Sequence, residues 1–168
     1  MVDKAPEQLQ DKTVLVVDDE KSISRLISII LQRQGFQNVL VANTGFEALE
    51  IMGIEHPAMA DREKTREPQR VDLLLLDIML PYLNGFDVCK AVKSKLDHQV
   101  PVILITGFNI EQHHARFIES GADDFLTKPI SPKELSSRVA LHLSRSAATA
   151  AAETKSTAGD VANAGAEI

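Results

Sequence analysis

Several residue types are scarce in this sequence, and each shortage excludes a class of protein. The one cysteine, Cys89, rules out an internal disulfide framework and any multi-cysteine metal site. The formal net charge is −6, and lysine and arginine form no cluster along the chain. Proteins that bind nucleic acids contact the phosphate backbone through such basic clusters, so the sequence predicts no nucleic-acid partner.

Long apolar runs and a targeting signal are also missing. No run approaches the roughly 20 residues that a membrane-spanning helix needs, so we expect no membrane association. Residues 1–10 are polar and lack the basic-then-apolar order of a signal peptide. With a single cysteine, these features favour a cytoplasmic protein.

Five short apolar runs, separated by segments of helical periodicity, dominate the rest of the chain. They cover residues 14–17, 39–41, 73–76, 102–105 and 125–126. Such runs are typical of buried parallel strands. Helical patterns follow them over about 23–31, 44–52, 86–95, 111–120 and 131–143. The sequence therefore predicts a doubly wound α/β fold of five β–α units.

Capping residues support two of these helices. Thr44 and Glu47 have the spacing of a capping box. Ser131 is expected to cap the last helix, with Pro132 as its first residue and Glu134 as the reciprocal partner.

Three segments lie outside the repeated unit, which leaves residues 12–145 as the folded domain. Residues 1–11 are expected to be flexible. Residues 54–70 are polar and highly charged, and we interpret them as a surface insertion with a helical turn around 59–64; a partner-contact loop is the alternative. Residues 146–168 are rich in alanine without an apolar face, which predicts a frayed helix end followed by disorder.

Four of the five strands lead to a polar residue suited to phosphoryl chemistry, whereas the run 39–41 ends at alanine and asparagine. The polar residues are Asp18, Asp19, Asp77, Thr106 and Lys128. In an open parallel sheet, ligands bind outside the carboxyl ends of the strands. Three carboxylates in one crevice repel each other unless a cation compensates, so the set suits a divalent cation and a phosphoryl group.

The motifs around these residues resemble those of the response-regulator receiver domain of two-component signalling, as in chemotaxis-type single-domain regulators. They are V-L-V-V-D-D-E, L-L-L-L-D-I-M-L-P-Y-L-N-G-F, I-L-I-T-G and G-A-D-D-F-L-T-K-P. The resemblance covers roughly residues 12–145. It implies a flavodoxin-like five-stranded parallel sheet of order 2-1-3-4-5, a phosphorylatable aspartate and an essential Mg²⁺ ion.

By this resemblance, Asp77 accepts the phosphoryl group, because a carboxylate can attack phosphorus in line. Mg²⁺ would be bound directly by Asp19 and Asp77, largely through water by Asp18, and by the main-chain carbonyl of Met79. Apart from self-phosphorylation from a phosphodonor and slow self-dephosphorylation, the resemblance implies no enzyme activity.

The remaining site residues follow from the same resemblance. Lys128 would pair with Asp77 and then with its phosphate, and the Thr106 hydroxyl would bind a phosphoryl oxygen. Phe125 matches the switch aromatic that turns inward when the threonine moves. The Lys128–Pro129 peptide bond is expected to be cis.

The resemblance implies a histidine kinase or a histidine phosphotransfer protein as the phosphodonor. A downstream protein, or a second copy of the chain after phosphorylation, would bind the face of the fourth helix, fifth strand and fifth helix. Asp123, Asp124 and Arg138 could supply charge pairs across such a dimer. Met79 and Phe108 are expected to keep water from the phosphoryl group and to slow its hydrolysis.

Three other interpretations remain open. A magnesium-dependent phosphatase or phosphotransferase of the haloacid-dehalogenase type usually has a second acid two residues after its aspartate, but Met79 occupies that position here. A receiver-like binding module could act without phosphate. The chain could also be the receiver portion of a longer regulator.

Overall fold

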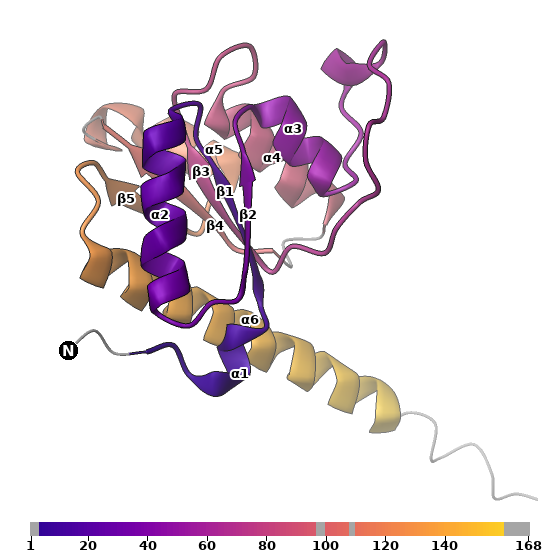
Figure 1. The fold of residues 1–168 in the computed structure, drawn as a ribbon. Coiled ribbons are helices and arrows are strands. Elements are labelled where there is room, and N and C mark those ends of the chain that lie inside the picture. Colours follow the sequence, from indigo (N-terminus) through magenta and orange to yellow (C-terminus); the bar gives the residue numbers. More distant parts are fainter. Residues whose placement is uncertain (1–3, 97–99, 108–109, 160–168) are drawn as a thin grey trace, which may run out of the picture.

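The computed structural model describes residues 4–96, 100–107 and 110–159. Its centre is a five-stranded sheet of order β2-β1-β3-β4-β5, in which every neighbouring pair is parallel (Figure 1). The strands are β1 (Thr13–Val17), β2 (Asn38–Ala42), β3 (Leu73–Asp77), β4 (Val102–Thr106) and β5 (Asp124–Thr127). The predicted doubly wound fold and its strand order are confirmed.

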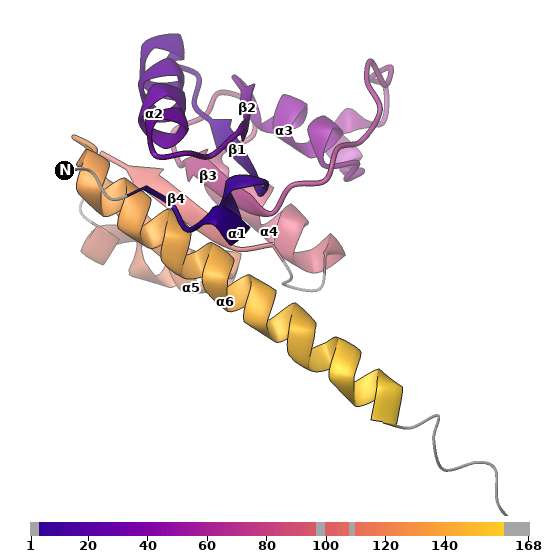
Figure 2. The same ribbon diagram turned by 60° about the horizontal axis from the view of Figure 1, so that its bottom comes forward.

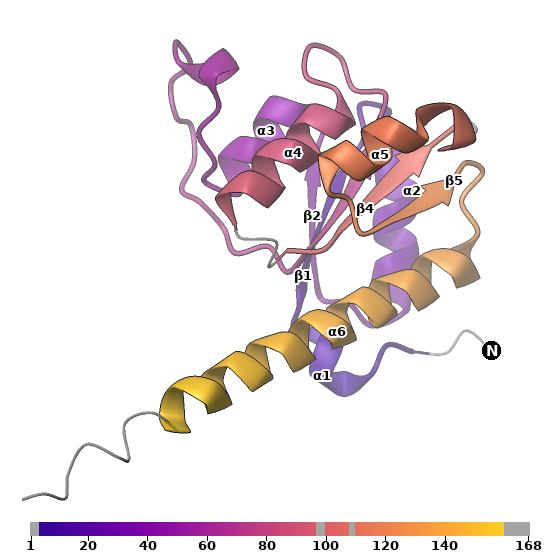
Figure 3. The ribbon, with the colours of Figure 1, turned by 180° about the vertical axis from the view of Figure 1, so that it is seen from behind.

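Helices cover both faces of the sheet. The helices are α1 (Glu7–Gln10), α2 (Lys21–Arg33), α3 (Gly45–Ile51), α4 (Gly85–Lys95), α5 (His114–Ser120) and α6 (Pro132–Gly159). In Figure 1, α2 lies in front of the sheet, and the view from behind in Figure 3 brings α4 and α5 forward. The helices α1, α2 and α6 pack on one face of the sheet and α3, α4 and α5 on the other, as a doubly wound fold requires.

The leucines of β3 show why the sheet is buried on both sides. Leu74 and Leu76 belong to the core beneath α3 and α4, whereas Leu73 and Leu75 belong to the core beneath α2 and α6. Successive side chains of a strand point to opposite faces, so an unbroken apolar run fills both cores.

The cap residue accepts the expected N–H at both predicted helix starts, although Glu47 accepts the N–H of Asn43 rather than that of Thr44. The Thr44 hydroxyl accepts the Glu47 N–H at 3.1 Å, and Gly121 ends α5 with a φ of 74°. At the last helix, Ser131 Oγ accepts the Glu134 N–H at 3.4 Å, but the Glu134 carboxylate pairs with an arginine one turn later. The helix expected over 111–120 is divided into the 3₁₀ helix η2 (Ile110–His113) and α5.

The N-terminal segment differs from its prediction as a flexible end. The part that the structure describes contains α1, with Ala5 and Leu9 buried in the core beneath α2 and α6. The Ala5 N–H donates to the Gln34 carbonyl at 2.8 Å, and Figure 2 shows α1 beside α6. Two apolar side chains with backbone hydrogen bonds therefore fasten a segment that looked polar in sequence.

The C-terminal segment also differs from its prediction, because α6 continues to Gly159. Its last part projects away from the rest of the fold in Figures 1 and 2. Alanine has the highest helix propensity, and this outweighs the missing apolar face over residues 146–159. Residues 160–168 lie outside the described residues.

The segment 54–70 forms a loop outside α3, at the upper right of Figure 1. The helical turn expected around 59–64 lies slightly earlier, as the 3₁₀ helix η1 (Pro57–Met59). Within the described part of the chain, no helix combines the length and apolar character needed to cross a membrane.

Candidate functional site

The carboxyl ends of β1 and β3 bring three carboxylates together. Asp18, Asp19 and Asp77 each offer an oxygen atom, and these atoms lie within 4.8 Å of one another. Because β1 and β3 are adjacent and in parallel register, residues that end the two strands meet at one edge of the sheet. Asp18 and Asp77 are buried and Asp19 is exposed, so the cluster is open to solvent on one side.

Lys128 supplies the positive charge of this cluster. Its Nζ lies 2.9 Å from Asp77 Oδ2 and 3.1 Å from Asp18 Oδ2. Its backbone N–H donates to the Thr106 carbonyl at 2.8 Å, and the Lys128–Pro129 peptide bond is cis, as predicted. The Lys128 ammonium thus forms ion pairs with two buried carboxylates, whereas the resemblance implied a pair with Asp77 alone.

Backbone donors fix the remaining carboxylate oxygens. Asp18 Oδ1 accepts the Glu20 N–H at 2.9 Å, and Asp77 Oδ1 accepts the Met79 N–H at 3.0 Å. The Met79 side chain is exposed, and its assignment as a carbonyl ligand stays a prediction. In each buried carboxylate, one oxygen therefore accepts a hydrogen bond from a backbone N–H and the other accepts one from Lys128.

The electrostatics of the cluster favour a bound cation. Burial raises the pKa of Asp18, against the opposing hydrogen bonds from Glu20 and Lys128. Burial disfavours the charge of Lys128, but its hydrogen bonds to Asp77 and Asp18 outweigh this and raise its pKa. Three carboxylates facing one ammonium leave excess negative charge, and oxygen ligands of this kind suit a hard divalent cation.

Two further residues position the cluster, and neither is among the site residues predicted from the sequence. A side chain on Gly85 would come 2.3 Å from the Asp77 carbonyl, so the β3–α4 connection can fold back over Asp77 only with glycine there. Asn43 follows β2, the one strand that was predicted to supply no polar residue to the site. Its side-chain amide donates to the Asp18 carbonyl at 3.1 Å, a contact with no sequence signature.

Thr106 and Phe125 lie on the adjacent strands β4 and β5, and their roles at the site stay predictions. Thr106 is buried at the end of β4, beside Thr127 of β5. Phe125 is half-buried and packs edge-to-face on Phe117 of α5, with ring centroids 5.8 Å apart. Their proposed movement stays a prediction, and Phe108 lies outside the described residues.

The face expected to bind a partner consists of α5, β5 and α6 in the present labels. Two of the residues expected to pair across a dimer, Asp124 and Arg138, pair with each other within the chain. Arg138 contacts Asp124 at 2.6 Å and Glu134 at 3.0 Å, while His142 Nε2 lies 2.9 Å from Asp124. Burial opposes ionisation of Asp124, but the hydrogen bonds from His142 and Arg138 prevail and lower its pKa.

A model of the response regulator receiver domain family matches residues 14–140. The alkaline phosphatase synthesis transcriptional regulatory protein PhoP of Bacillus subtilis is 38% identical over 136 residues, which cover 81% of this chain and 50% of PhoP. The transcriptional regulatory protein CpxR of Escherichia coli is 37% identical and covers 79% of this chain and 50% of CpxR. The chain therefore spans about half the length of these curated relatives.

Solved structures give the same assignment. The receiver domain of a signal transduction histidine kinase from Syntrophus aciditrophicus has a TM-score of 0.66 at 29% identity, covering 79% of this chain and 90% of that one. The response regulator DrrB of Thermotoga maritima, an OmpR/PhoB homologue, has a TM-score of 0.65 at 30% identity, covering 80% of this chain and 54% of DrrB.

Proposed function

The chain belongs to the response regulator receiver domain family, and on that premise we propose that Asp77 accepts a phosphoryl group in the presence of Mg²⁺. The donor is the phosphohistidine of a histidine kinase or a histidine phosphotransfer protein. The observation that supports this proposal most directly is the cluster of Asp18, Asp19 and Asp77 around the ammonium of Lys128.

The geometry suggests how each residue contributes. An Asp77 oxygen attacks phosphorus, the new O–P bond forms, and the N–P bond breaks to release the donor imidazole. Mg²⁺, held by Asp18, Asp19, Asp77 and the Met79 carbonyl, would neutralise charge on the phosphoryl oxygens. The Met79 N–H and Lys128 already hold the carboxylate in a fixed orientation, which reduces the reorganisation needed for attack.

Phosphorylation then alters the α5–β5–α6 face. Lys128 exchanges Asp77 for the phosphate, the Thr106 hydroxyl binds a phosphoryl oxygen, and Phe125 turns inward. These movements shift a pre-existing equilibrium toward a form that binds a downstream protein or a second copy. In a dimer, Arg138 would have to exchange its contact with Asp124 of its own chain for one across the interface. Arg138→Glu should therefore abolish phosphorylation-dependent dimerisation, and unchanged dimerisation would remove this part of the proposal.

We place this function in the cytoplasm and assign the chain no other enzyme activity.

The match to half of PhoP and of CpxR supports a second proposal, that the chain is the receiver portion of a longer regulator. Any contact of such a regulator with DNA would then belong to another portion, since this sequence shows no basic cluster.

The deciding experiment measures intact mass after incubation with acetyl phosphate. Wild type should gain one phosphoryl group when Mg²⁺ is present, and Asp77→Asn should gain none. Glu63→Gln, a change in the exposed insertion, is the matched control and should behave as wild type. No gain with acetyl phosphate or with a panel of kinases would favour a phosphate-independent binding module.

We also propose slow self-dephosphorylation, because the bulky Met79 lies two residues beyond Asp77. Met79→Asn should shorten the lifetime of the phosphorylated form by admitting and orienting water. The decay of the phosphorylated mass measures this lifetime. An unchanged decay rate would show that Met79 does not shield the phosphoryl group.

A further inference from the structure

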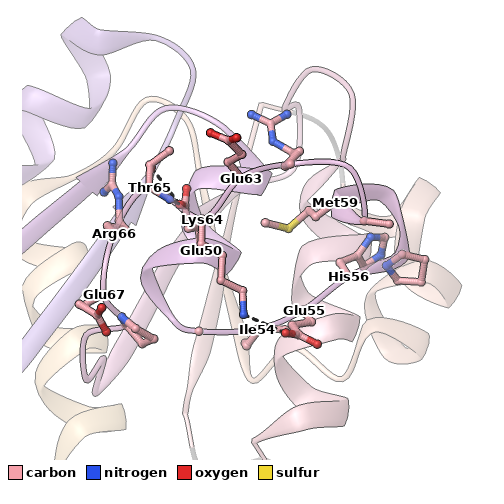
Figure 4. A pocket seen from close by; sticks show the side chains of 15 residues that line it. Glu50, Ile54, Glu55, His56, Met59, Glu63, Lys64, Thr65, Arg66 and Glu67 are labelled. Carbon is pink, nitrogen blue, oxygen red and sulfur yellow. Dashed lines mark hydrogen bonds and ion pairs between the residues drawn. The ribbon is translucent and has the colours of Figure 1, made fainter.

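The insertion 54–70 is bound to α3 by two pairs of polar contacts, and a third pair joins two residues within the insertion. The pairs are Arg66 with Glu47, Thr65 with Glu50, and Lys64 with Glu55. In Figure 4, dashed lines join Thr65 to Glu50 and Lys64 to Glu55 across the hollow beneath the loop. The loop is thus tied to α3 at Thr65 and at Arg66.

The Arg66–Glu47 pair is the first of a series of hydrogen bonds that leads to the cluster of Asp18, Asp19 and Asp77, here called the acidic centre. Arg66 donates to Glu47 Oε1 at 3.1 Å, and Glu47 Oε2 accepts the Asn43 N–H at 2.8 Å. The side-chain amide of Asn43 then donates to the carbonyl of Asp18 at 3.1 Å. Consecutive hydrogen bonds therefore connect a residue of the insertion to a carboxylate-bearing residue of the site.

The last of these bonds acts on the peptide group that joins Asp18 to Asp19. Asn43 holds the carbonyl of this peptide, while the Asp18 N–H donates to the Ala42 carbonyl at 3.2 Å. Both carboxylates project from the ends of the same peptide, so its orientation determines where they point. A metal site depends on such support of its ligands.

We propose that Arg66 is a positioning residue for the acidic centre. It fixes the Glu47 carboxylate, through which Asn43 orients the Asp18–Asp19 peptide. The inference rests on the proposed function, in which these aspartates hold Mg²⁺. The Arg66 side chain is 37% exposed, so a protein that binds the insertion and draws Arg66 away would weaken the Mg²⁺ site.

The test is the affinity of the full chain for Mg²⁺, measured by calorimetry. Arg66→Ala should weaken binding about threefold, on the scale of a partly exposed ion pair. Glu47→Ala should weaken it about tenfold, because the Asn43 N–H also loses its acceptor. Arg66→Lys should restore most of the affinity, and Arg66→Ala should have no further effect in the Glu47→Ala variant.

Lys64→Ala is the matched control, since Lys64 lies in the same insertion but pairs with Glu55, outside this chain of hydrogen bonds. It should bind Mg²⁺ as wild type does. Amide exchange of Asn43, followed by NMR without Mg²⁺, should accelerate in Arg66→Ala and stay unchanged in Lys64→Ala. A merely structural effect would lower the melting temperature of both variants without separating them in these two measurements.

Unchanged affinity in Arg66→Ala, an equal loss in Lys64→Ala, or a further loss in the double variant would overturn the proposal. A wild type that binds Mg²⁺ in an Arg66-dependent way but takes no phosphoryl group would refute the proposed function and support the positioning role. A wild type that binds no Mg²⁺ would overturn both.

Discussion

Lys128 Nζ lies 2.9 Å from Asp77 Oδ2, on the carboxylate oxygen that the Met79 N–H leaves free. The same ammonium reaches Asp18 Oδ2 at 3.1 Å. It therefore reduces the repulsion between two buried carboxylates before any phosphoryl group arrives. Lys128 therefore has two roles: it neutralises the buried carboxylates in the structure, and it is the proposed ligand of the phosphate.

Replacing Lys128 by alanine should lower the free energy of unfolding at pH 7 by about 1–3 kcal/mol, because two buried carboxylates lose a shared partner. The pKa of Lys128 is raised by folding, so its contribution is complete below the ordinary lysine pKa and is lost as pH rises through the folded value. Urea unfolding at pH 7 measures the loss, which should shrink in acid as Asp18, whose pKa is raised by burial, becomes protonated.

Mg²⁺ provides a second measurement on the same variant. The ion should stabilise Lys128→Ala more than wild type, since it replaces the missing positive charge. The control is Lys133→Ala, an exposed lysine of α6. An equal stabilising effect of Mg²⁺ on all three proteins would contradict the counter-charge role.

Asp18→Asn should raise the melting temperature in the absence of Mg²⁺, with a gain on the order of 1 kcal/mol. Burial raises the pKa of Asp18, so the ionised carboxyl destabilises the fold, and this penalty grows as pH rises from the ordinary aspartate pKa through the folded value. Below the ordinary aspartate pKa this penalty is absent, and the variant should lose its advantage. Circular dichroism melting at pH 7 and pH 3.5 tests both statements.

The same melting curves with added Mg²⁺ should reverse the order. Wild type gains stability by binding the ion, whereas Asp18→Asn has lost a ligand. A variant less stable than wild type without Mg²⁺ would show that the hydrogen bonds of Asp18 outweigh the effect of burying its charge.

Much of the fold and site could be predicted because both depend on periodicity. The unbroken leucines of β3 required a sheet covered on both faces, and parallel strands necessarily gathered Asp18, Asp77 and Thr106 at one edge. The strand order came from the family resemblance rather than from the residues, since periodicity alone does not order strands.

The errors concern contacts that a pattern does not encode. Asn43 acts through its amide on a main-chain carbonyl, and such a bond requires proximity but no particular spacing. Leu9 alone marked the docking of α1, too short a signal against the polar residues around it. In residues 146–159, the alanine content favoured a helix, whereas the missing apolar face favoured disorder. The segment is helical, so helix propensity was the stronger of the two effects.

Leu9→Ala tests whether the N-terminal segment is part of the core. Leu9 is 3% exposed, so its truncation should lower the free energy of unfolding by about 2–4 kcal/mol. A flexible N-terminus, as the sequence first indicated, would give no change. Urea unfolding is the measurement, and Glu7→Ala, an exposed residue of the same helix, is the control.

Lys93 is a buried lysine that resembles a solvated one in sequence. It is 4% exposed, and its ammonium donates to the Val100 carbonyl at 2.9 Å and pairs with Asp123. Asp123 also accepts the Val102 N–H at 2.7 Å, so this pair fastens α4 to the start of β4 and to the turn before β5. Removing Lys93 would leave the Val100 carbonyl without its donor, whereas Asp123 is exposed to solvent and keeps the Val102 N–H.

Lys93→Ala should therefore lower the free energy of unfolding by about 1–3 kcal/mol, whereas Lys90→Ala, exposed on the same helix, should change it by less than about 0.5 kcal/mol. Lys93→Met keeps most of the side-chain volume but removes the charge, so its loss measures the ion pair without the cavity. If Lys93→Met is as stable as wild type, the ammonium contributes nothing and Lys93 stabilises α4 by packing alone.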